Sequence, residues 1–116
     1  MRGGGGSSSS ISIIDTYVNG TSGYRIWSDG YCEQWGEGNA VKSGDTAVLN
    51  ITFTKTFKDT NYRFDGVTGD TIMSGFSIAL PGYMIHSKST TGAQLYGGGL
   101  NPIYWRASGF LADGQY

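Results

Sequence analysis

The sequence is short of charge, and this shortage excludes several kinds of partner. Only 15% of its 116 residues are charged, against about a quarter in an average globular domain. Eight Lys and Arg stand against nine Asp and Glu, so the formal net charge is −1 and no basic field exists to hold nucleic acid or anionic lipid. No apolar run approaches the roughly 18 residues that a membrane span needs, and no secretory signal pattern follows Met1. We expect neither a nucleic-acid partner nor insertion into a membrane.

Cysteine and histidine, the residues of most nucleophilic and metal sites, occur once each. Cys32 has no partner for a disulfide within the chain, and we expect a small buried hydrophobe, because a nucleophile would need a positioned histidine. His86 is predicted to be structural or solvated. No residues cluster with metal-ligand spacing, and Asp29 and Glu33 belong to one turn and its strand, whereas a glycosidase pair spans a cleft. We expect no catalytic residue, no metal, no other cofactor and no enzyme activity.

The first ten residues, MRGGGGSSSS, form a flexible coil by composition and cannot pack into a core. They are either a leader added for expression or the end of a natural linker. Residues 11–116 remain, and their number suits one domain with one modest core.

Short strands are the predicted elements of this domain. No window of about a dozen residues has the period of a helix, and glycine recurs too often for helix interiors. Within 46–54, the residues Ala47, Leu49, Ile51 and Phe53 alternate with more polar ones, as on a strand with one face in the core. We predict an all-β fold, an antiparallel β-sandwich, with strands at 11–18, 24–28, 31–36, 46–54, 61–67, 72–79, 83–88, 93–96 and 103–110.

The stretch GYRIWSDGYCEQWG, which begins at Gly23, predicts a β-hairpin around its Asp-Gly step, since glycine accepts the positive φ that a tight turn needs. A hairpin with one solvated face alternates apolar and polar residues. Here large apolar side chains fall in both alternation classes. Both faces of this hairpin are therefore expected to be covered.

Two registers of the hairpin are possible. A two-residue turn would oppose Ile26 to Glu33. A three-residue loop with a bulge at Gly30 would oppose Arg25 to Glu33 and Ile26 to Cys32. We favour the bulged register, because it separates a charged pair from an apolar pair.

Aromatic residues are abundant, at 14% of the chain. The stretch LYGGGLNPIYWRASG places Tyr96, Asn101 and Tyr104 around a glycine-rich loop. Flat aromatic faces beside amide and hydroxyl groups suit sugar rings, so these three residues are the predicted receptor contacts, with Tyr96 and Asn101 on loop 96–102 and Tyr104 just after it. The alternative interpretation is that Tyr104 and Trp105 alternate between the core and another buried face. Loops 66–75 and 37–45 are the next candidates for recognition.

Three segments together carry a family resemblance: GYRIWSDGYCEQWG, then VLNITFTKTFKDTNYRF, and the final IYWRASGF. They resemble the C-terminal, receptor-binding domain of bacteriophage or prophage tail fibres, over about residues 23–112. The resemblance implies a β-sandwich in each chain and a homotrimer at the tip of a fibre. It also implies a virion component that meets the host from outside. It supplies no catalytic residues.

A homotrimer would explain the doubly apolar hairpin, because a hairpin between the sandwich core and a threefold axis is covered on both faces. Trp35 is expected in the core or at the axis. The predicted function is an adhesin that binds a bacterial cell-surface receptor, a glycan above all. The alternatives are a purely structural trimerisation cap and, less favoured, a glycan-degrading enzyme. The residues assigned to the trimer interface or the core hairpin are Tyr24, Arg25, Trp27, Glu33, Gln34 and Trp35.

Overall fold

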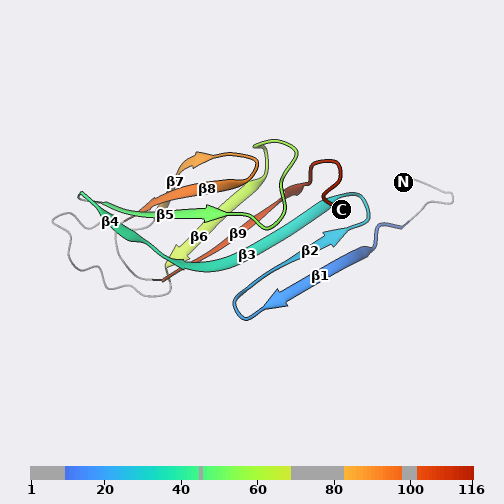
Figure 1. The fold of residues 1–116 in the computed structure, drawn as a ribbon, viewed down its shortest axis with the longest axis horizontal. Helices are drawn as coiled ribbons and strands as arrows, with labels where there is room; N and C mark the ends of the chain where they lie inside the picture. The colour runs from blue at the N-terminus through green and yellow to red at the C-terminus, as the bar shows by residue number, and fades with distance from the viewer. Residues whose placement is uncertain (1–9, 45, 69–82, 98–101) are drawn as a thin grey trace.

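The computed structural model describes residues 10–44, 46–68, 83–97 and 102–116, which form two antiparallel sheets. The predicted all-β fold is confirmed, and Figure 1 shows the two sheets stacked on each other. The strands are β1 (Ile13–Asn19), β2 (Ser22–Trp27), β3 (Tyr31–Asn39), β4 (Val41–Ser43), β5 (Thr46–Thr52), β6 (Arg63–Thr68), β7 (Tyr83–Lys88), β8 (Gly92–Gly97) and β9 (Pro102–Phe110). Short β4 was not predicted, and the strand predicted at 72–79 lies outside the described residues.

The order of the strands mixes near and distant parts of the chain. The five-stranded sheet has the order β1-β2-β3-β9-β6, and the four-stranded sheet has the order β4-β5-β8-β7. β9 therefore fills the place between β3 and β6. Strands β1 and β2 lie on the side of the five-stranded sheet away from the four-stranded one (Figure 1), and every residue of β1 is exposed.

The core lies between the two sheets and contains the predicted face of β5. Ala47, Leu49 and Ile51 are buried, and so is Phe53 just beyond the strand, as the period-two pattern predicts. The Phe53 ring makes edge contacts with other buried rings, including that of Phe57 at a centroid distance of 5.2 Å. Burying such a side chain contributes about 1.5–3 kcal/mol, so this aromatic cluster holds the sheets together.

The β2–β3 hairpin has the bulged register. Arg25 pairs with Glu33 and Ile26 with Cys32, as predicted. Gly30 adopts a φ of +89°, and its N–H donates to the carbonyl oxygen of Trp27 at 2.9 Å. The three-residue loop therefore forms because glycine takes the left-handed conformation that the bulge requires.

This register sorts the hairpin side chains into two faces. Ile26 and Cys32 point into the core, at 2% and 0% exposure, together with the amide of Gln34 at 1%. The opposite face carries the aromatic side chains of Trp27, Tyr31 and Trp35 and the charged pair, whereas Tyr24 packs against the core. Both faces of the hairpin are thus apolar in part, which agrees with the sequence pattern.

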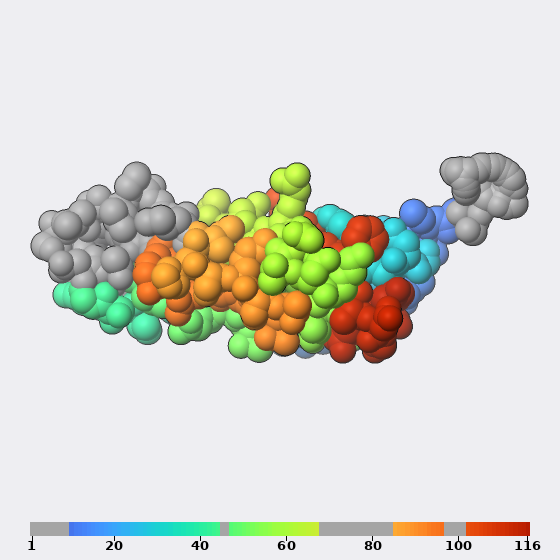
Figure 2. Space-filling model, turned by 90° about the horizontal axis from the view of Figure 1, so that it is seen from above, coloured from blue at the N-terminus to red at the C-terminus, as the bar shows by residue number. Residues whose placement is uncertain are grey.

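The segment after β5 fastens the sandwich at one end. The N–H of Phe57 donates to the carbonyl of Thr90 at 2.9 Å, and the N–H of Ala112 donates to the carbonyl of Thr56 at 3.0 Å. Figure 2 shows this segment, in green, between β7 and β8 in orange and the C-terminal residues in red. The segment therefore joins the four-stranded sheet to the end of β9.

Candidate functional site

The outer face of the five-stranded sheet carries side chains in rows that cross the strands, because the strand registers align them. The first row begins with Ile13, which pairs with Trp27, and continues through Tyr31, which pairs with Phe110. The Trp27 and Tyr31 rings are 5.8 Å apart and the Tyr31 and Phe110 rings 5.4 Å apart, both edge to face. Aromatic pairs prefer this arrangement. Trp27, Tyr31 and Phe110 form a continuous strip, here called the aromatic row.

Charged side chains occupy the next part of the same face. Arg106 on β9 pairs with Asp65 on β6, with 3.5 Å between Nη2 and Oδ2 and both side chains more than half exposed. An exposed pair of this kind is worth about 0–1 kcal/mol. Trp35 pairs with Gly23, where an added Cβ would lie 2.8 Å from the Trp35 Cζ2 atom. The indole ring therefore covers the strand backbone where β2 has no side chain.

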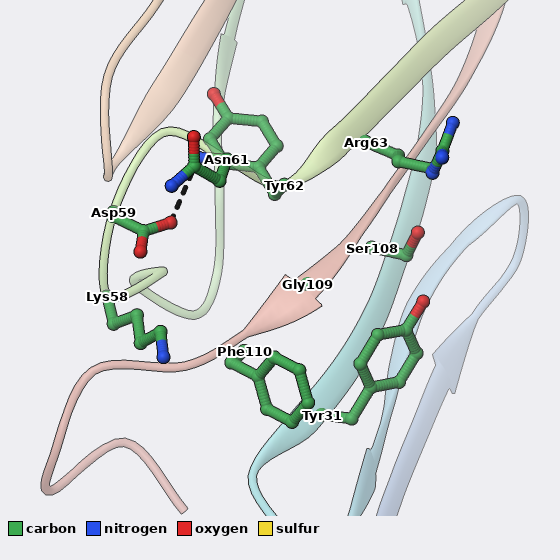
Figure 3. A pocket seen from close by; sticks show the side chains of 9 residues that line it. All are labelled: Tyr31, Lys58, Asp59, Asn61, Tyr62, Arg63, Ser108, Gly109 and Phe110. Atoms are coloured by element: carbon green, nitrogen blue, oxygen red, sulfur yellow. Dashed lines mark hydrogen bonds between the residues drawn. The ribbon is translucent and has the colours of Figure 1, made fainter.

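A pocket of about 350 Å³ opens beside the aromatic row. Figure 3 shows the rings of Tyr31 and Phe110 at one end and Arg63 at the other, with Lys58 on the loop that leads into β6. The remaining polar side chains of the lining are those of Asp59, Asn61 and Ser108. We call this the Lys58–Arg63 pocket.

The loop side of the pocket is held by backbone hydrogen bonds. The N–H of Lys58 donates to the carbonyl of Phe110 at 2.9 Å. The N–H of Asn61 donates to Oδ1 of Asp59 at 2.9 Å, which closes an Asx turn. Tyr62 anchors the end of the loop, because its hydroxyl donates to the carbonyl of Ser89 at 2.8 Å. Desolvation of this phenol raises the pKa of Tyr62 to about 12. The pocket is therefore built on a fixed loop.

The hairpin residues predicted from the sequence divide between the two faces. Gln34 is a core residue, and Tyr24 is partly buried beside the core with its ring 5.6 Å from that of Tyr17. Trp35 is partly exposed on the outer face, so the expectation that it belongs to the core is wrong; burial at a trimer axis stays a prediction. The other members of the predicted set, all on the outer face, are Arg25, Trp27 and Glu33.

The predicted receptor contacts do not form one cluster among the described residues. Tyr96 points away from the core on the four-stranded sheet, where its ring stacks on that of His86 at 3.9 Å. Tyr104 is 44% exposed on the outer face of the other sheet, in the row of Glu37 and Val67. These two faces are on opposite sides of the sandwich, because the chain changes sheets between β8 and β9. Asn101 lies outside the described residues.

The two alternative loops are described only in part. The segment 37–45 contains the end of β3 and all of β4, and most of 66–75 lies outside the described residues. The side chains of Tyr104 and Trp105 alternate between the two faces of β9: Trp105 packs against the core, and Tyr104 faces outward.

Sequence reasoning missed the residues of the Lys58–Arg63 pocket. Tyr31 and Phe110 are 79 positions apart and meet only through the pairing of β3 with β9. The local signal was the segment FKDTNYR, which places Lys58 and Arg63 at the two ends of an Asp-Thr-Asn turn. Two basic residues on either side of a turn could have predicted a binding loop.

The described residues give no support for metal chemistry or a reactive thiol. No group of three or more His, Cys, Asp or Glu among them could hold a metal ion. Burial raises the pKa of Cys32 to about 12, so its thiol stays protonated at neutral pH. Within the same ranges, no helix is long and apolar enough to span a bilayer.

The fold is one that tail fibres of known structure share. An N-truncated R2-type pyocin tail fibre matches 89% of this chain with a TM-score of 0.60 and 20% identity. The Pseudomonas aeruginosa R1 pyocin fibre, in a structure of its C-terminal residues 323–701, matches 88% with a TM-score of 0.56 and 18% identity. The corresponding R2 fibre of P. aeruginosa, C-terminal residues 323–691, matches 87% with a TM-score of 0.52 and 18% identity.

These matches confirm the resemblance to a tail-fibre domain as a likeness of fold. The chain spans 39%, 28% and 26% of the lengths of the three fibre structures, in the same order. No protein-family model matches the sequence, and no curated protein matches it.

Proposed function

We propose that this chain is a receptor-binding part of a fibre on a phage or phage-like particle, that it works as a homotrimer, and that it binds a glycan on the bacterial surface. The observation that carries the proposal is the shared fold, since 89% of the chain matches a pyocin tail fibre at a TM-score of 0.60. In this role the domain binds without catalysing a reaction. It acts at the outer surface of the host cell, as part of the particle.

The outer face of β1 and β2, together with Trp35 on β3, is the surface that we assign to the contact between chains. Ile13 and Val18 on β1 are 52% and 60% exposed, and Trp27 and Trp35 project on the same side. A projecting edge strand with exposed apolar side chains favours association. Packing against two further copies would remove this surface from water, and a stable interface needs about 800 Å² from each partner.

The oligomeric state is tested by light scattering coupled to size exclusion at micromolar concentration. We expect three times the mass of the 12.4 kDa chain. The double variant Trp27→Glu, Trp35→Glu places charge on the assigned surface and is expected to elute as a single chain. Val41→Glu is the matched control, because Val41 is 63% exposed on the other sheet. A parent protein with the mass of one chain would contradict the homotrimer.

Receptor binding is tested with fluorescently labelled protein on a panel of bacterial strains, with matched strains that lack the surface polysaccharide. We expect adsorption to some strains and its loss when the polysaccharide is absent. An intact trimer that adsorbs to no strain would favour a structural trimerisation cap. Shortened polysaccharide chains after incubation would instead identify a glycan-degrading enzyme.

A further inference from the structure

We propose that the Lys58–Arg63 pocket binds an acidic sugar, with Arg63 holding the carboxylate or phosphate of the sugar and the sugar ring lying against Tyr31 and Phe110, beside Lys58. This inference rests on the proposed function and names the chemical class of its ligand. The site differs from the Tyr96, Asn101 and Tyr104 set predicted from the sequence.

The charge of the pocket favours an anion. Neither Lys58 nor Arg63 has a carboxylate within salt-bridge distance among the described residues, whereas Arg106 on the same face is paired with Asp65. The carboxylate in the lining, that of Asp59, already accepts a hydrogen bond from the N–H of Asn61 through Oδ1. Arginine holds carboxylates and phosphates through two parallel hydrogen bonds. An anionic ligand would therefore give Lys58 or Arg63 the negatively charged partner that the described residues do not provide.

The aromatic end of the pocket favours a sugar ring over a bare anion. Phe110 is 44% exposed, and its ring meets that of Tyr31 edge to face at 5.4 Å. The Lys58 Nζ atom lies 5.4 Å from the centre of the Phe110 ring, so cation and aromatic surface are adjacent. A sugar that carries an acidic group offers apolar C–H surface beside its charge, which matches this arrangement.

The remaining groups of the pocket suit hydroxyls. The Ser108 hydroxyl can donate and accept, and Asn61 offers an amide with both functions. A volume of about 350 Å³ is at the small end of ligand sites. The pocket therefore fits one acidic sugar unit of a longer glycan, and the rest of the glycan can extend out of the open side of the pocket.

The position of the pocket is compatible with the proposed trimer. Its lining comes from β9, the start of β6 and the loop before β6, with Tyr31 at the start of β3, whereas the surface assigned to chain contacts covers β1, β2 and Trp35. Each chain of a trimer would keep its own pocket. Three weak sites on one particle can raise avidity by about 10²–10⁴.

Four probes separate the possible sources of the anion. We would titrate the protein with methyl glucuronide, glucose 6-phosphate, neutral methyl glucoside and inorganic phosphate, and follow the ring signals of Tyr31 and Phe110 by NMR. We expect the glucuronide or glucose 6-phosphate to bind at least about tenfold more tightly than the glucoside, with shifts at both rings. The better of the two identifies the acidic group. Equal binding of the glucoside, or inorganic phosphate binding as tightly as either acidic sugar, would overturn the proposal.

Variants test whether these residues carry the binding. The double change Lys58→Gln, Arg63→Gln is expected to lower affinity for the acidic sugar at least about tenfold while the thermal midpoint stays unchanged. Arg106→Gln is the matched control, since it removes a positive charge from the same face outside the pocket. An equal loss in both variants would show a general field effect and overturn the assignment.

Cell adsorption then separates this inference from the proposed function. If the parent adsorbs and the Lys58→Gln, Arg63→Gln variant does not, the pocket is the receptor site. If both adsorb equally, the pocket inference fails and the proposed function stands. If the parent adsorbs to no strain, the proposed function fails, and the titration with the sugars alone decides the inference.

Discussion

The side-chain amide of Gln34 bonds both backbone groups of Lys55. Its Oε1 atom accepts from the Lys55 N–H at 2.9 Å, and its Nε2 donates to the Lys55 carbonyl at 2.7 Å. Gln34 is 1% exposed, so these bonds run through the core. The pair reproduces one rung of a β-ladder and fastens the segment after β5 to the middle of β3. This explains why a hairpin that is otherwise apolar on this face contains an amide.

Replacing Gln34 should therefore be costly. Gln34→Leu is expected to lower the free energy of unfolding by about 2–4 kcal/mol, because two backbone groups of Lys55 lose their partner and each buried unsatisfied group costs about 1–3 kcal/mol. Urea denaturation measures the change. Gln94→Leu is the control, since the Gln94 amide bonds an exposed Asn50 side chain. Equal midpoints for Gln34→Leu and the parent would contradict the role of this amide.

Gly23 is predicted to tolerate no side chain. An added Cβ would collide with the carbonyl oxygen of Tyr17 and lie 2.8 Å from Cζ2 of Trp35. Gly23→Ala should destabilise the protein by about 1–3 kcal/mol through overpacking, measured as a lower thermal midpoint. Gly38→Ala is the comparison, because its Cβ would meet only the flexible end of Leu49. A larger loss in Gly38→Ala than in Gly23→Ala would refute the prediction.

Alkaline pH should weaken the fold through Tyr62. Its pKa is raised from 10.0 to about 12 in the folded protein, mainly by desolvation. The folded state thus favours the neutral phenol, and the stability that this provides is complete below pH 10 and declines as the pH rises toward 12. In Tyr62→Phe, we expect a shallower decline over this window and a loss of about 1–2 kcal/mol at neutral pH. Unfolding curves of the two proteins at several pH values test both expectations. Parallel declines in stability for the parent and Tyr62→Phe would contradict the role of the Tyr62 phenol.

The Cys32 thiol should react only when the protein unfolds. It is 0% exposed, and burial raises its pKa from 9.0 to about 12. At pH 8 we expect almost no labelling by a thiol reagent in the native protein and full labelling in concentrated guanidinium chloride. Rapid labelling of the native protein would show that the hairpin opens readily.

Local patterns predicted much of the fold. Alternation in residues 46–54 predicted the buried face of β5, and the separation of a charged pair, Arg25 and Glu33, from an apolar pair predicted the hairpin register. β4, Val41–Ser43, escaped prediction because three exposed residues carry no alternation signal. Features that depend on one turn or one strand were therefore accessible from the sequence.

The candidate site was less accessible, because it depends on pairing between distant strands. Ser108 on β9 pairs with Glu33 on one side and Arg63 on the other. No pattern in the sequence around Ser108 predicts either pairing. The same long-range order separates Tyr96 and Tyr104, which lie close together in the sequence. Sequence reasoning treated neighbours along the chain as neighbours in space, and the change of sheet between β8 and β9 breaks that relation.

The central place of β9 has a consequence for the order in which the protein is made. β3 and β6 both pair with β9, and neither pairs with the other. Until residues 102–110 have been synthesised, the five-stranded sheet consists of two separate pieces with open edges. Strands that are far apart in the sequence pair slowly, and open strand edges can pair with another chain in the meantime. If three chains assemble as proposed, chains that meet before this closure can exchange β9 with one another.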